Sequence, residues 1–158
     1  MKKIIVLLLA LLMFSCQEGL QPEPGRFLNG KVIFQNPKSE WPPEDSLNEI
    51  RVVALKSFPP NDLVDEIISG NAFFTDPLPL YQDSVEFHLE IEDAPIELKY
   101  IGVAQNYGSI LEWKVIGVYS ETNDNEQHSS VFVGSSGSKH IEIFVDFNDL
   151  PPQPFEAP

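Results

Sequence analysis

A strict alternation of apolar and polar residues is the feature that most limits what this chain can fold into. The clearest example is residues 85–91, in which every second side chain is apolar and would point to one face: Val85, Phe87, Leu89 and Ile91. Fourteen prolines among 158 residues add stiff loops and disfavour long helices. The sequence therefore predicts short strands, each with one face buried.

Seven segments have this strand pattern and are separated by turn-forming residues: 26–34, 50–57, 85–91, 96–105, 110–120, 130–133 and 139–147. Residues 50–57 are β-branched and mostly apolar, which is typical of a strand in the centre of a sheet. Seven short strands at regular spacing indicate an all-β domain over 26–148, an antiparallel seven-stranded Greek-key β-sandwich.

One short helix is expected in a loop of this sandwich. Asn61 or Asp62 can cap its first turn, residues 63–68 form its body, and Gly70 suits the left-handed conformation that ends a helix. A helix of about two turns depends on tertiary contacts for its stability.

The strand order resembles that of a known sandwich family. Gly30-Lys31-Val32 opens the domain, Ile50–Ala54 and Tyr100–Ala104 follow, and Ile141-Glu142-Ile143 closes it. This layout is similar to the prealbumin-like sandwich of carboxypeptidase regulatory-like domains, and a fibronectin type III-like sandwich would have nearly the same pattern. Either resemblance implies an adhesive, spacer or accessory module with no catalytic residues.

The N-terminal residues have the pattern of a secretory signal peptide. Met1-Lys2-Lys3 is positively charged, and Ile4–Phe14 is an apolar run of eleven residues. A membrane-spanning helix needs about 20 apolar residues, so this run is too short to cross a bilayer.

The end of this segment resembles a bacterial lipoprotein signal. Cys16 is the only cysteine of the chain and directly follows a small residue, Ser15. The resemblance implies removal of residues 1–15, acylation of Cys16 with chains such as palmitate, and a flexible tether over 16–25. Gln17 in place of Asp favours the outer membrane. A plain signal peptide or membrane anchor with an incidental cysteine is the alternative.

The charge balance limits the partners of the chain. The net charge is −14, and removal of residues 1–15 would take away Lys2 and Lys3 but no acid, leaving −16. Such a charge excludes nucleic acid as a partner, because phosphates require a basic face. It also means that the membrane would hold the protein through lipid alone, without electrostatic help.

The Pro-rich tail, 149–158, cannot continue a strand.

No residue pattern points to catalysis. His88 lies between Glu86 and Glu90 on the polar face of a predicted strand, which is more typical of a solvated sheet face than of a zinc site. There is no Gly-x-Ser-x-Gly motif. The acidic segments 124–126 and 146–149 do not match a calcium-binding loop. We therefore expect a non-enzymatic protein with no cofactor and no metal.

Loop aromatics are the strongest candidates for a binding site. Trp41, Tyr81 and Tyr107 fall in predicted connections, where such rings could stack on a sugar or anchor a protein partner. The alternative is that they close the open ends of the sandwich.

Three hypotheses follow, in this order: a lipid-anchored interaction or accessory module, a glycan- or small-ligand-binding protein, and a hydrolase that uses His88. The tripeptides 45–47 and 83–85 also resemble O-glycosylation acceptors.

Overall fold

The computed structural model describes residues 26–60 and 63–155. The predicted signal peptide, Cys16 and the predicted tether therefore lie outside the described residues, as do Asn61 and Asp62, the candidates for the helix cap.

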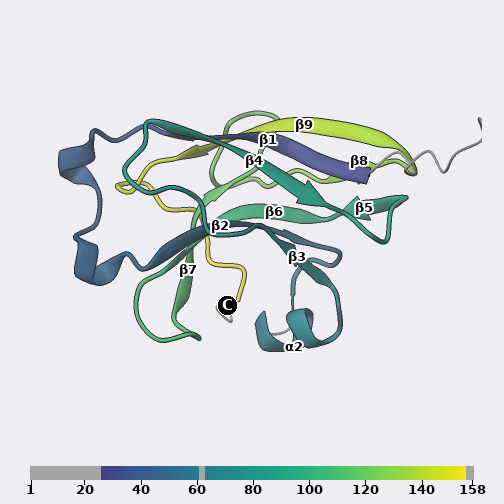
Figure 1. Ribbon diagram of the computed structural model, residues 1–158, viewed down its shortest axis with the longest axis horizontal. Coiled ribbons are helices and arrows are strands. Elements are labelled where there is room, and N and C mark those ends of the chain that lie inside the picture. The colour runs from purple at the N-terminus through teal and green to yellow at the C-terminus, as the bar shows by residue number, and fades with distance from the viewer. Residues whose placement is uncertain (1–25, 61–62, 156–158) are drawn as a thin grey trace, which may run out of the picture.

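Two sheets pack face to face and form the body of the domain (Figure 1). One has the order β4-β1-β9, and the other has the order β3-β2-β6-β7. A further pair, β5 and β8, forms a two-stranded sheet. The strand bounds are β1 (Arg26–Phe34), β2 (Glu49–Leu55), β3 (Ala72–Phe74), β4 (Ser84–Glu90), β5 (Ile96–Leu98), β6 (Tyr100–Asn106), β7 (Trp113–Val118), β8 (Val131–Val133) and β9 (Gly137–Val145).

Helical structure is short and confined to connections. Two single turns, η1 (Lys38–Glu40) and η2 (Glu44–Ser46), precede β2, and α2 (Leu63–Ile68) follows it. The helix predicted at 63–68 is present, and Gly70 ends it with φ +67°. No helix in the part of the chain that the structure describes is long and apolar enough to cross a membrane.

The prediction of an all-β fold is confirmed, but the strand inventory differs from the expected seven. The described residues form nine strands, because β3 was not expected and the segment 96–105 divides at Lys99 into β5 and β6. The chain changes sheets at this residue: β5 pairs with β8, and β6 pairs with β2. The backbone amide of Lys99 donates to the carbonyl of Leu55 at 2.8 Å.

The pairing is also not purely antiparallel. β1 and β9 lie parallel over their whole length, with Gly30 opposite Ile141. A parallel pair cannot be joined by a tight hairpin, and here almost the entire domain serves as the connection. β1 is antiparallel to β4 on its other side, so it is the central strand of its sheet.

The period-two pattern correctly predicts the core. In β4, Val85, Phe87 and Leu89 are buried while the residues between them are exposed. They pack in one cluster with alternate residues of the facing sheet, including Val52 of β2 and Val103 of β6.

Gly30 provides a test of this packing. A methyl group at Gly30 would lie 2.7 and 2.8 Å from two ring carbons of Phe87 and would also meet the carbonyl oxygen of Ile141. We expect Gly30→Ala to lower the free energy of unfolding by about 1–3 kcal/mol, since overpacking forces the core apart. Gly134→Ala is the control, because its nearest atom would be 3.8 Å away, and its effect should stay within about 0.5 kcal/mol. Urea denaturation measures both, and equal stabilities would contradict the register of β1.

Candidate functional site

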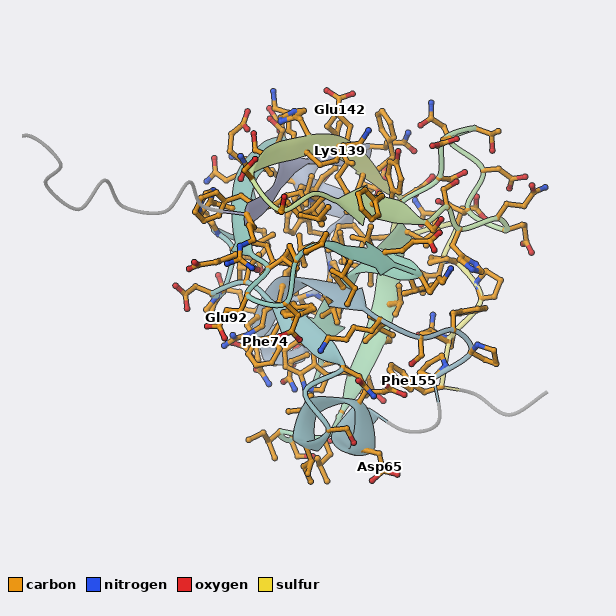
Figure 2. The ribbon with its side chains drawn as sticks, turned by 90° about the vertical axis from the view of Figure 1, so that its right-hand side faces the viewer. Asp65, Phe74, Glu92, Lys139, Glu142 and Phe155 are labelled. Atoms are coloured by element: carbon orange, nitrogen blue, oxygen red, sulfur yellow. The ribbon has the colours of Figure 1, made fainter. Side chains whose placement is uncertain are left out.

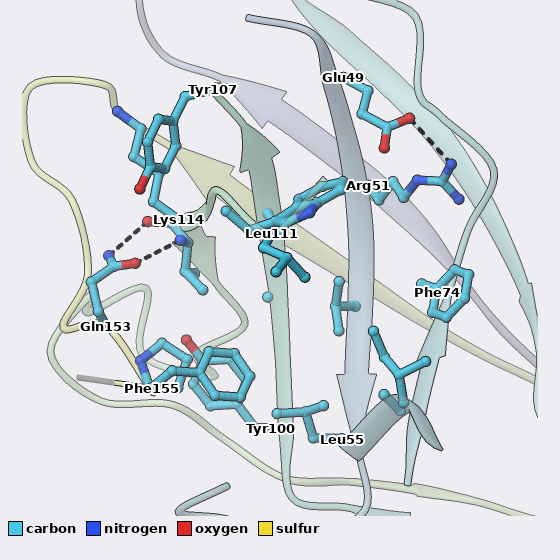
Figure 3. A pocket seen from close by; sticks show the side chains of 18 of the residues that line it. Glu49, Arg51, Leu55, Phe74, Tyr100, Tyr107, Leu111, Lys114, Gln153 and Phe155 are labelled. Carbon is cyan, nitrogen blue, oxygen red and sulfur yellow. Dashed lines mark hydrogen bonds and ion pairs between the residues drawn. The ribbon is translucent and has the colours of Figure 1, made fainter. Parts of the chain in front are cut away.

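A groove of about 770 Å³ runs over the outer face of the four-stranded sheet (Figure 3). Its floor is low because the central strand β6 presents Gly102 and Ala104 there, two residues with almost no side chain. Val53 of β2 and Val115 of β7 flank them. A volume of this size is typical of a small-molecule binding site.

The floor is itself a hydrophobic cluster, separate from the core between the sheets. Leu55, Tyr100, Val115 and Val118 are buried together, each no more than 6% exposed. The four-stranded sheet is therefore apolar on both faces.

Three segments form the walls. α2 contributes Ile67 and Ile68, the loop from β6 to β7 contributes Ile110 and Leu111, and the chain beyond β9 contributes Phe155. Figure 1 places α2 and the C-terminal end on the same side of this sheet. In Figure 2, Phe74 and Phe155 lie in the half of the molecule that holds α2, whereas Lys139 and Glu142 lie at the opposite layer.

Most of the exposed apolar surface gathers at this groove. The described residues include ten large hydrophobic side chains that are exposed, and eight of them line it: Ile67, Ile68, Phe74, Tyr107, Ile110, Leu111, Leu150 and Phe155. Only Phe58 and Phe132 lie elsewhere. Single exposed hydrophobics are ordinary, but a contiguous group around a hollow marks an interaction site.

Side-chain amides hold the backbone of the β6–β7 loop. Asn48 donates from Nδ2 to Oδ1 of Asn106 and to the carbonyl of Gly108, both at 2.8 Å. Asn106 in turn donates from Nδ2 to the carbonyl of Ser109 at 2.7 Å. These bonds tie the loop to the start of β2.

The far side of the same loop is fixed as well. The indole Nε1 of Trp113 donates to the carbonyl of Ile110 at 2.7 Å, and the amide of Ser109 donates to Oε2 of Glu112 at 2.5 Å. The bond from the Ser109 backbone holds the pKa of Glu112 below its usual value. Ile110 and Leu111 nevertheless remain 85% and 68% exposed. The loop is thus a fixed support that presents two aliphatic side chains to solvent.

Gln153 attaches the C-terminal segment to the edge of the sheet. Its Oε1 accepts from the amide of Val115 at 2.7 Å, and its Nε2 donates to the carbonyl of Val115 at 2.9 Å. One side-chain amide therefore makes both bonds that the N–H and C=O of a residue in another antiparallel strand would make with β7 (Figure 3). This attachment places part of the predicted tail, including Pro154 and Phe155, along the groove.

The charged residues of the groove lie at one end of it (Figure 3). Glu49 and Arg51 form an ion pair at 3.1 Å at the start of β2. Arg51 also donates to the carbonyl of Thr75 at 2.9 Å. Lys114, on the other side, has its Nζ 5.9 Å from the ring centre of Tyr107.

The other end of the groove carries no charge. Leu55 and Tyr100 are paired in the sheet register there, and Phe155 lies over the same end (Figure 3). Tyr100 is 4% exposed, and its hydroxyl has no hydrogen-bond partner among the described residues. Burial raises the pKa of Tyr100, so the phenol is neutral at physiological pH.

Of the three aromatics predicted as ligand-binding, only Tyr107 lines the groove. Trp41 is 7% exposed and packs against Phe34, Tyr81 and Phe147, with ring centres 4.5, 5.2 and 5.0 Å away. Trp41 and Tyr81 therefore lie together at one end of the core, and Tyr107 is apart from them. Glycan binding by these rings stays a prediction.

The other polar candidates are spread over the surface. His88 is exposed on β4, where Nδ1 lies 2.5 Å from Oδ1 of Asn29 and the ring contacts Phe27. The two acidic loop segments meet where Nδ2 of Asn125 donates to the carbonyl of Asp149 at 3.0 Å. Within residues 26–60 and 63–155, no three His, Cys, Asp or Glu side chains come together as a metal site would require.

Comparison of the chain with protein-family models, with curated proteins and with solved structures finds no match.

Tyr100 allows a test of the apolar end. We expect Tyr100→Phe to raise the free energy of unfolding by about 1 kcal/mol, because a buried hydroxyl without a partner is costly. Tyr107→Phe is the control, because Tyr107 is 42% exposed, and it should change the free energy of unfolding by no more than about 0.5 kcal/mol.

The pH dependence gives a second readout for Tyr100→Phe. Because burial raises the pKa of Tyr100, the folded protein keeps the phenolic proton above pH 10 while the unfolded chain releases it, so the free energy of unfolding falls as the pH rises past 10. The wild type should lose stability above pH 10 more steeply than Tyr100→Phe. Parallel urea denaturation curves across this pH range would contradict the burial of the hydroxyl.

Proposed function

We propose that this chain is a non-enzymatic, lipid-anchored protein of the cell envelope whose β-sandwich is an accessory binding module. The groove on the outer face of the four-stranded sheet is its binding site, and it takes an apolar ligand. The observation that carries this proposal is the gathering of eight of the ten exposed large hydrophobics around one hollow.

The free energy of burial supports a binding role. Each square ångström of apolar surface removed from water contributes about 25 cal/mol, so side chains such as Ile68, Ile110 and Leu111 contribute most when something covers them. The scaffolded loop keeps two of them exposed in the unbound protein. This pre-organisation lowers the entropic cost of binding.

The anchor and the finer fold are part of the same proposal. The position of Cys16 after an eleven-residue apolar run supports acylation, and Gln17 supports an outer-membrane location. The order of short strands supports a prealbumin-like or fibronectin type III-like Greek-key arrangement. An accessory module of this kind requires no catalytic residue.

The anchor is tested by Cys16→Ser. We expect the wild type to fractionate with membranes and to have an intact mass that includes acyl chains on Cys16, because several chains together hold a protein stably in a bilayer. Cys16→Ser should abolish both the acylation and the membrane association. A wild-type product that is soluble and unmodified at Cys16 would contradict the anchor.

The groove is tested by binding of the neutral apolar dye Nile red and by substitutions on two opposite walls. Ile68→Asn combined with Leu111→Asn should weaken dye binding about thirtyfold, since each substitution removes roughly 1 kcal/mol of apolar contact. Phe132→Asn is the matched control, because Phe132 is 64% exposed but does not line the groove. Fluorescence titration measures all three proteins. Equal affinities would show that the dye binds elsewhere and would count against the groove.

A further inference from the structure

We infer that the groove binds a single-chain amphiphile with an anionic head group, whose head lies at Lys114 and whose acyl chain runs along β6 toward Phe155. The inference rests on the proposed function and specifies the ligand class of the same site.

Polar and apolar residues are separated along the strands of the groove. In the sheet register, Glu49 is opposite Asn106 at one end, and Leu55 is opposite Tyr100 at the other. All three charged residues that line the groove, Glu49, Arg51 and Lys114, lie toward the first end (Figure 3). A ligand that matches both ends has one polar head and a long apolar body.

The charge at the polar end of the groove is positive. The described residues hold 20 Asp and Glu against 8 Lys and Arg, yet only one acid, Glu49, lines the groove. Glu49 is neutralised by Arg51 at 3.1 Å. Lys114 has no carboxylate within ion-pair distance among the described residues, so the polar end carries one uncompensated positive charge. This charge is complementary to an anion.

The length of the groove matches that of an acyl chain. β6 spans seven residues, Tyr100–Asn106, which corresponds to about 20 Å at a rise of roughly 3.3 Å per residue. One leaflet of a bilayer contributes half of a hydrocarbon core of about 30 Å, so an acyl chain reaches about 15 Å. The groove is therefore long enough for one acyl chain and its head.

The middle of the floor offers no free hydrogen-bonding side chain to a ligand. Val53, Gly102, Ala104 and Val115 present no polar side-chain atom, and the amide of Gln153 is already bonded to the backbone of Val115. A peptide or a sugar lying here would leave its own polar groups unpaired, which costs free energy for each group. A hydrocarbon chain has no such groups to satisfy.

Competition with Nile red tests the ligand class. Myristate, tetradecyl phosphate and tetradecanol share the same chain and differ in the head, so the two anions represent a carboxylate and a phosphate source. We expect both anions to displace the dye at concentrations about tenfold lower than tetradecanol, as for a charge-assisted contact. Octanoate should displace it much more weakly, since it buries a shorter chain.

Variants identify the head-group residue. Lys114→Gln should reduce the preference for anions over tetradecanol from about tenfold to within about twofold, with each displacement corrected for the dye affinity of that variant. Lys139→Gln removes the same charge from the opposite sheet and should keep the preference. The inference would be overturned if tetradecanol and the anions displaced the dye equally from the wild type. It would also be overturned if Lys114→Gln and Lys139→Gln lost the preference for anions to the same extent.

Spin-labelled stearates test the direction of the chain. A nitroxide at carbon 5 should broaden the amide signal of Tyr107 most, and one at carbon 16 should broaden those of Leu55 and Phe155 most. The reverse order would overturn the assigned orientation.

If Nile red binds at the groove and no amphiphile displaces it, the ligand class is wrong while the proposed function stands. If Ile68→Asn with Leu111→Asn leaves dye binding unchanged, the proposed function itself fails.

Discussion

The four-stranded sheet is apolar on both faces, and the rest of the structure depends on how each face is covered. Its inner face, with Val52 and Val103, packs against β4-β1-β9 and forms the core. Its outer face, with Leu55 and Tyr100, is covered only in part by α2, the β6–β7 loop and the C-terminal segment. Because these segments cover the small floor residues incompletely, a groove remains. A complete third layer would have filled it.

The groove is thus a property of side-chain size along one strand. Gly102 and Ala104 in the middle of β6 make a hollow, and larger residues at its borders give it walls. Gln153 fixes the C-terminal segment to β7 through two hydrogen bonds. One wall of the groove is therefore held by a side chain and not by strand pairing. The same bonds occupy the backbone of Val115, which would otherwise be open to pairing with another chain.

Local patterns in the sequence predict the strands and the core, because alternation along 85–91 and the apolar run at 50–57 report burial directly. The groove could not be predicted in this way. Ile110 and Leu111 continue the pattern of a strand, but bonds from Asn48 and Trp113 and between backbone groups of the turn hold them in a loop. The burial of Trp41 likewise depends on Phe147, more than 100 residues away in the chain. Contacts at such separations leave no periodicity to detect.

The parallel pairing of β1 with β9 has a consequence for how the protein matures. The strand next to the N-terminal end of the domain is completed by the strand nearest its C-terminal end, over nine residues of each. The chain leaves the ribosome, or crosses a membrane, N-terminus first. The sheet β4-β1-β9 therefore cannot be completed until residue 145 has emerged, because β9 is not yet available to pair with β1. Truncation before β9 would leave β1 with an open edge, so nascent and shortened chains need protection from aggregation that the finished domain does not.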